Sequence, residues 1–125
     1  MSDLRARVRE ELAQLERVQA ELAKIASRTD DERKIELIQL RRELAQQIAR
    51  LGQAMEQYLE KSGDRELMRE FRQYYSDMRS KAATHQANWP AVRLNQADEE
   101  YQRSARAVRD ANKAFTTWIR AQIGG

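Results

Sequence analysis

The sequence has no cysteine, one histidine, one proline and four glycines among its 125 residues. Without cysteine the chain forms no disulfide and offers no thiol for catalysis or metal binding, which fits a reducing cytoplasm. No apolar run approaches the roughly 18 residues that a membrane-spanning helix needs. The first residues also show no signal-peptide core. We therefore expect a cytoplasmic protein without a membrane span.

The scarcity of histidine limits the chemistry that the chain can carry. His85 has no motif around it that would complete a catalytic triad, and we expect it to be a surface or loop residue. A single histidine cannot supply the two Glu-x-x-His motifs of a di-iron bundle or the ligands of a histidine-based zinc site. The sequence has no glycine-rich phosphate loop of the common types. We expect no enzymatic activity, no cofactor and no metal.

Charged residues make up 34% of the chain, whereas aromatic residues make up only 6%. Abundant Ala, Leu, Glu, Arg and Gln with regular apolar spacing is typical of long helices and not of a disordered chain. The net charge is +3, and acids and bases are nearly balanced in every quarter of the sequence. This even mixing indicates solvated surfaces more than a nucleic-acid-binding footprint.

The periodicity predicts four helices, over about 3–27, 31–61, 65–86 and 97–123, with an irregular loop at 87–96. Helix 31–61 has the longest apolar stripe, and Gly63 follows it as a helix stop. Helix 3–27 carries a seam from Leu4 to Ile25 at steps of three and four residues. We predict a single all-α domain, four-helix bundle-like, in which the first two helices form a long antiparallel coiled-coil hairpin.

The seam of the first helix has two possible partners. The short connection to the second helix favours an antiparallel hairpin within the chain. Alternatively, the seam pairs with its own copy in a homodimer, and the protein is then a structural coiled-coil dimeriser.

Aromatic side chains are the candidates for contact with a partner protein: Tyr74, Tyr75, Trp89 and Trp118. Large aromatics are enriched among the residues that contribute most to binding energy at protein interfaces. Trp89 precedes the only proline and lies in the expected loop. Trp89 either packs into the hydrophobic core of the bundle or contacts a partner protein.

Basic residues of the last helix form the second candidate site: Arg103, Arg106, Arg109, Lys113 and Arg120. Four of them fall within an arc of about 60° at 100° per residue, with Arg103 near its edge. The arc suits phosphates or an acidic partner. Arginines exposed to solvent in the C-terminal part of a helix are also common without any binding role.

The sequence alone therefore indicates a non-catalytic protein-interaction module. It is an adaptor, chaperone or inhibitor that binds a helical segment of another protein, or of itself, in a groove. The alternatives are a nucleic-acid-associated protein that uses the basic face of the last helix, and the coiled-coil dimeriser.

Overall fold

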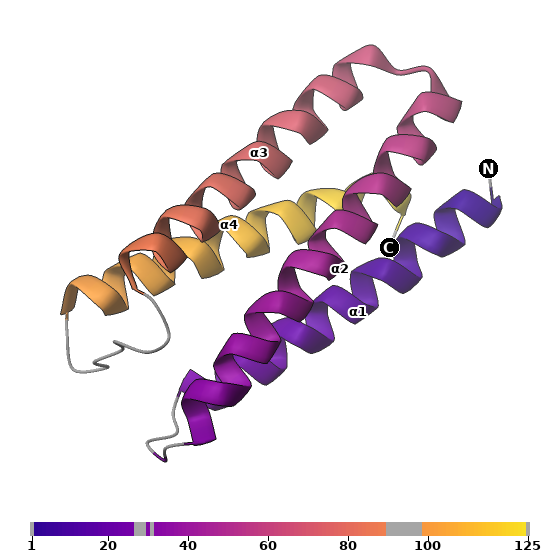
Figure 1. Cartoon of the computed structure of the whole chain (residues 1–125). Helices are drawn as coiled ribbons and strands as arrows, with labels where there is room; N and C mark the ends of the chain where they lie inside the picture. Colours follow the sequence, from indigo (N-terminus) through magenta and orange to yellow (C-terminus); the bar gives the residue numbers. More distant parts are fainter. Residues whose placement is uncertain (1, 27–29, 31, 90–98, 125) are drawn as a thin grey trace. The chain divides into compact units, whose positions relative to one another are not determined.

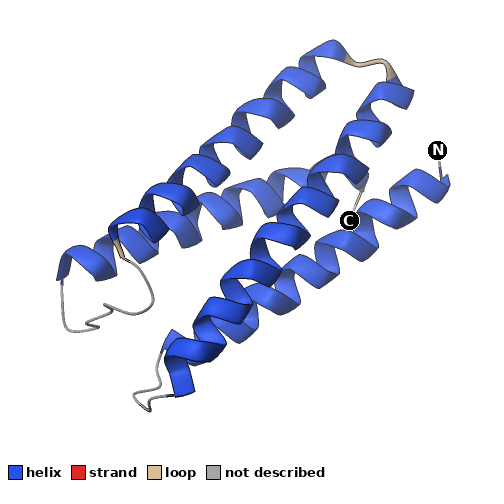
Figure 2. Ribbon diagram, viewed as in Figure 1, coloured by secondary structure: helices blue, strands red, loops and turns tan. Residues whose placement is uncertain are grey.

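A computed structural model describes residues 2–26, 30, 32–89 and 99–124 of the chain. Within these ranges it contains four α-helices and no strand (Figures 1 and 2). The helices are α1 (Ser2–Ala26), α2 (Glu32–Ser62), α3 (Arg65–Asn88) and α4 (Glu99–Ile123). The predicted all-α fold class is confirmed.

The third helix is longer than the sequence predicted. It ends at Asn88, two residues beyond the expected boundary, so the first part of the predicted loop is helical. The Trp89 N–H donates to the His85 carbonyl at 2.9 Å, which continues the helical hydrogen-bond pattern through the last turn. The remainder of the predicted loop, 90–96, lies outside the described residues.

The helices pair in sequence order into two compact units, Met1–Asp64 and Arg65–Gly125. The first unit is the α1–α2 hairpin and the second is the α3–α4 hairpin, and the two helices of each hairpin run antiparallel (Figure 1). Antiparallel pairs of this kind are the building blocks of bundle-like all-α folds. The prediction of a single domain concerns how the units unfold, and it stays a prediction.

The first unit has the predicted long antiparallel hairpin, so α1 pairs with α2 of its own chain. Buried side chains follow α1 at steps of three, four or seven residues: Val8, Leu12, Leu15, Val18 and Ile25. Those of α2 are Leu37, Leu44, Ile48, Leu51, Ala54, Met55, Tyr58 and Leu59. Fully burying one such side chain stabilises a fold by about 1.5–3 kcal/mol. The hydrophobic seam therefore accounts for the pairing.

Polar contacts fix the register of this hairpin. The buried Gln47 side chain of α2 donates from Nε2 to the Glu11 carbonyl of α1 at 3.0 Å. The Arg7 guanidinium donates to the Gln57 side-chain oxygen at 2.6 Å. Arg7 precedes Glu11 along α1 whereas its partner Gln57 follows Gln47 along α2, as an antiparallel arrangement requires.

Gly63 ends α2 in the left-handed conformation, with φ +73°. Its N–H donates to the carbonyls of Leu59 and Glu60 at 3.0 and 3.2 Å. A side chain disfavours this conformation, which explains why glycine stands there. The sequence predicted this helix stop, and the structure confirms it.

Candidate functional site

The second unit holds an aromatic cluster where α3 meets α4. Phe71 of α3 and Phe115 of α4 are fully buried, with ring centroids 6.2 Å apart. Tyr75 stacks on Phe71 at 5.3 Å, and Trp118 lies 6.4 Å from Phe71 on the side of α4. Aromatic pairs at these separations are favourable beyond the area that they bury. The cluster holds α3 and α4 together and fixes the position of the aromatic residues at its edge.

Tyr74 is the predicted contact residue that remains most accessible. It is 37% exposed, and its ring stacks on Trp118 with centroids 5.4 Å apart and an interplanar angle of 24°. Trp118 itself is only 9% exposed. The buried tryptophan therefore acts as a rigid support for the tyrosine, whose outer face is open to solvent.

A shallow groove of about 470 Å³ runs beside this stack, and its lining is mostly apolar. We call it the Tyr74 groove. Its lining residues come from α3 and α4 only: Tyr74, Asp110, Lys113, Ala114, Thr117, Trp118 and Ala121. Three of the α4 residues are small and exposed, so another backbone can come close to this helix. An aromatic wall beside a row of small residues suits the apolar side of a helix.

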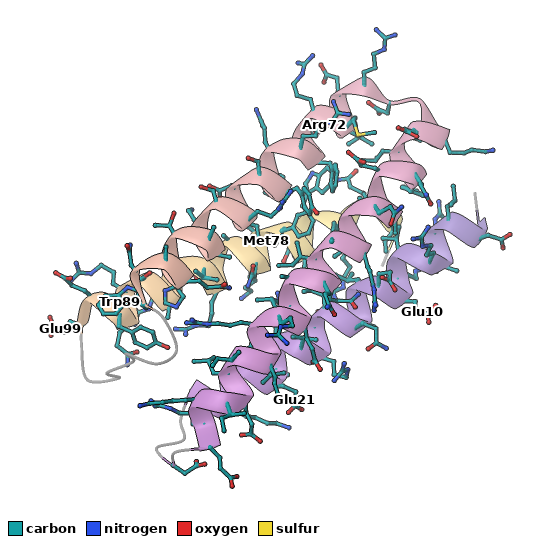
Figure 3. The ribbon with its side chains drawn as sticks, in the orientation of Figure 1. Glu10, Glu21, Arg72, Met78, Trp89 and Glu99 are labelled. Carbon is teal, nitrogen blue, oxygen red and sulfur yellow. The ribbon has the colours of Figure 1, made fainter. Side chains whose placement is uncertain are left out.

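The two other predicted aromatic contacts lie elsewhere. Tyr75 is partly covered by Phe71 and Phe115, and the Arg79 guanidinium lies 5.2 Å from the centre of its ring. Trp89 follows the last residue of α3 and meets Tyr101 edge to face at 5.6 Å. Figure 3 shows Trp89 at the end of the hairpin where α4 begins, near Glu99. The four aromatic candidates therefore do not lie together, although Tyr74 and Trp118 stack on each other.

His85 was expected at the surface or in a loop, and that prediction is wrong. The residue lies within α3 and is only 8% exposed. Its Nδ1 is 2.7 Å from the Ser104 hydroxyl of α4, and its ring packs against Tyr101 at 5.4 Å. A buried polar group needs such a partner because leaving it unpaired costs free energy. The histidine is thus a polar element of the α3–α4 contact.

A spacing in the sequence carries the signal for this burial. Phe71, Met78 and His85 are separated by seven residues each, which places them on one face of α3. All three are buried. The predicted position of His85 was based on the chemistry of histidine alone and did not use this seven-residue spacing. Its partner Ser104 had no signal of its own in the sequence.

The predicted anion-binding residues all lie on α4. Arg103, Arg106, Arg109 and Lys113 are exposed, and Arg120 is half-buried. Within the described ranges, the charged groups of the first four make no hydrogen bond or ion pair with another side chain. These cations are therefore available to an anionic partner. Lys113 also lines the Tyr74 groove, so one of these cations lies at the edge of the apolar site.

Helix α3 separates its charges onto two flanks. Arg65, Arg69 and Arg72 line a second shallow groove, which has no aromatic residue in its lining and also includes Met68, Gln73, Ser76, Asp77 and Ser80. Glu66 and Glu70 lie on the other flank, next to Tyr74 in the helical repeat. Asp77 pairs with Lys81 at 3.3 Å, and both side chains are about half exposed. Such an exposed pair contributes little to stability.

The described residues contain no group of three or more His, Cys, Asp or Glu side chains arranged to hold a metal ion. None of their helices is long and apolar enough to cross a membrane. Comparison with protein-family models, with curated proteins and with solved structures finds no match to this chain.

Proposed function

We propose that the chain is a non-catalytic protein-interaction module, an adaptor, chaperone or inhibitor that binds a helical segment in the Tyr74 groove. The observation that carries this proposal is the exposed Tyr74 ring stacked on the buried Trp118 beside small residues of α4. Tyrosine and tryptophan on a rigid support lose little entropy on binding and are frequent anchors of interfaces.

The proposed mechanism is recognition of one face of an amphipathic helix. Apolar side chains of the partner, spaced by three or four residues, would lie against Tyr74 and Trp118. Ala114 and Ala121 are two turns apart on α4 and leave room for the partner's backbone. The binding energy would come mainly from apolar burial, so affinity should depend weakly on salt.

We also propose that the protein has no catalytic role. The single histidine, His85, lies in the α3–α4 contact. Its Nδ1 is within hydrogen-bond distance of the Ser104 hydroxyl, and its ring packs against the Tyr101 ring. We also propose a cytoplasmic location, and its support is the lack of cysteine in the sequence.

The proposal can be tested by quantitative affinity capture from a lysate of the producing organism. Tyr74→Lys should lower the yield of the specific partner at least about tenfold, because it removes an aromatic anchor worth about 2 kcal/mol or more. Ile35→Lys is the matched control, since Ile35 is 61% exposed on α2, in the other unit. Equal capture by the two variants would refute the assignment to the groove.

The exposed basic residues of α4 support a second candidate function, association with nucleic acid. The observation that favours it is the set of exposed cations without side-chain partners within the described ranges, Arg103, Arg106, Arg109 and Lys113. Binding to phosphates would weaken steeply as salt rises, because it releases counterions. It would be lost when Arg106, Arg109 and Lys113 are changed to Glu, whereas Tyr74→Lys would leave it intact or strengthen it. Fluorescence anisotropy with labelled RNA and DNA over a salt series measures both effects.

A further inference from the structure

We propose that the shallow groove of about 770 Å³ on α3 binds the phosphodiester backbone of a nucleic acid without reading its sequence. We call it the Arg69 groove, because Arg69 lines it between Arg65 and Arg72. All of its lining residues come from α3. It is therefore separate from the basic residues of α4 and from the Tyr74 groove, and the inference rests on neither function proposed for them.

Arg65, Arg69 and Arg72 form a row along α3, and all three are exposed. At 100° and about 1.5 Å per residue, the row falls within an arc of about 60° and is about 10.5 Å long. Tyr74 lies about 140–180° away from these arginines around the helix. The two grooves that α3 lines therefore face different directions.

Nothing else in the described part of the chain explains this row. None of its three guanidinium groups has a side-chain partner within the described ranges. Asp77 is the one acid in the lining, and it pairs with Lys81 at 3.3 Å. Arg65 is also the first residue of α3, where the helix dipole disfavours a cation. The row therefore matches an anionic ligand that comes from outside the chain.

The side chains of the Arg69 groove favour phosphate as that anion. A guanidinium donates two parallel hydrogen bonds to one phosphate, and such charge-assisted pairs are among the strongest in proteins. Gln73, Ser76 and Ser80 line the same groove and add neutral donors. Arginine, glutamine and serine are usual contacts to the phosphates and sugars of nucleic acids. With about 3.4 Å of rise per nucleotide in a duplex strand, the row is long enough for its arginines to reach different phosphates.

A protein helix fits the Arg69 groove less well than a nucleic acid does. Met68 is the only apolar residue in the lining, and none of the described residues that line it is aromatic. Protein interfaces have an apolar core, whereas interfaces with nucleic acids are more polar and much more positively charged. Without an aromatic residue the groove also has no platform for base stacking. Binding through the backbone alone is independent of sequence.

The acids of α3 limit where the backbone can lie. Glu66 and Glu70 are exposed on the flank between the row of arginines and Tyr74, where they repel phosphates. The nucleic acid is thereby held along the arginines, on the side of α3 away from the Tyr74 groove. The small net charge of +3 does not show this separation, because it sums both flanks.

The test is fluorescence anisotropy of the full chain with short labelled probes of duplex DNA, single-stranded DNA and RNA, each in two unrelated sequences. The two sequences of one probe type should bind within about twofold of each other. The combined change Arg65→Ala, Arg69→Ala and Arg72→Ala should lower the affinity at least about tenfold at about 50 mM salt. It should also reduce the slope of log affinity against log salt by about 2.7 for duplex DNA, or about 2.1 for a single strand, as three phosphate contacts require.

The matched control is the combined change Lys34→Ala, Arg42→Ala and Arg50→Ala on α2. It removes the same amount of positive charge from exposed positions of the other unit, and it should leave affinity and salt slope nearly unchanged. Alanine is the best helix former, and circular dichroism verifies that both variants are folded. An equal loss of affinity in both variants would show that only the overall charge matters, and it overturns the inference.

Three other results also overturn it. The first is that no probe binds at about 50 mM salt. The second is a loss of affinity confined to the change of Arg106, Arg109 and Lys113 to Ala, which would assign the binding to α4. The third is binding of polyglutamate but of no nucleic acid, which would make an acidic protein the occupant. The capture experiment with Tyr74→Lys has an independent outcome, because Tyr74 lies outside the Arg69 groove.

Discussion

Phe71 and Tyr74 lie in the same turn of α3 but differ in how far they are buried. Phe71 is fully buried and contacts Tyr75, Phe115 and Trp118, whereas Tyr74 stacks on Trp118 and is 37% exposed. The first side chain is needed to hold α3 against α4. The second adds little to that contact and remains available to a partner.

Phe71→Ala should therefore lower the free energy of unfolding by about 3–5 kcal/mol, the usual cost of a large cavity in a core. Tyr74→Ala should cost no more than about 1.5 kcal/mol, the scale of one aromatic pair. Urea denaturation followed by circular dichroism measures both. A loss at Tyr74 as large as that at Phe71 would mean that the tyrosine is a core residue, and the groove would lose its accessible wall.

Predictions for single residues were correct in some cases and wrong in others, and Tyr74, Trp118 and His85 show why. The aromatic character of Tyr74 and Trp118 indicated contact residues, but nothing local indicates that they stack on each other, because that depends on the register between α3 and α4. His85 was misassigned because its chemistry was weighed without its spacing from Phe71 and Met78. Its burial requires the Ser104 hydroxyl, a partner 19 residues away.

At the scale of the element, the α1–α2 hairpin follows almost entirely from apolar spacing. Most of the predicted seam of α1 is buried, with Leu4 and Leu22 half-buried, and Gly63 ends α2 as expected. The end of α3 was less predictable. The predicted boundary was residue 86, whereas the helix extends to Asn88, where His85 and Trp89 contact Tyr101 of α4. Tertiary packing of this kind overrides local propensity.

The seam makes a direct prediction for α2. Leu44→Asp places a carboxylate in the buried face of the α1–α2 hairpin and should unfold that hairpin, because an unpaired buried charge costs several kcal/mol. Ala45→Asp is the matched control, since Ala45 is the next residue and is exposed. Circular dichroism at 222 nm should show a large loss of helix for the first variant and almost none for the second. A stable, helical Leu44→Asp protein would show that the seam is misassigned.

At the scale of the whole molecule, the α1–α2 and α3–α4 hairpins unfold either together or one after the other. The sequence predicted one domain from a length of 125 residues, and the contacts group into two hairpins at Asp64. Length cannot decide between these descriptions, because it says nothing about the free energy that couples the units.

Both tryptophans lie in the second unit, which makes this coupling measurable. The milder variant Leu44→Ala should destabilise the first unit by about 2–5 kcal/mol. If the chain is one cooperative domain, tryptophan fluorescence and circular dichroism will shift to the same lower urea midpoint. A fluorescence transition that stays at the midpoint of the unaltered chain, while the helical signal shifts, would show two independent domains.

The central claim is that the Tyr74 groove binds a protein helix. Site-specific photo-crosslinking tests it most directly, with a benzophenone amino acid at position 74 and, as the control, at position 35 on α2. We predict that position 74 yields a defined crosslinked protein, with attachment mapped by mass spectrometry to an apolar face of a helix in a second copy or in another protein. Position 35 should not yield that product. The absence of a specific product at position 74, or the same products from both positions, would contradict the account.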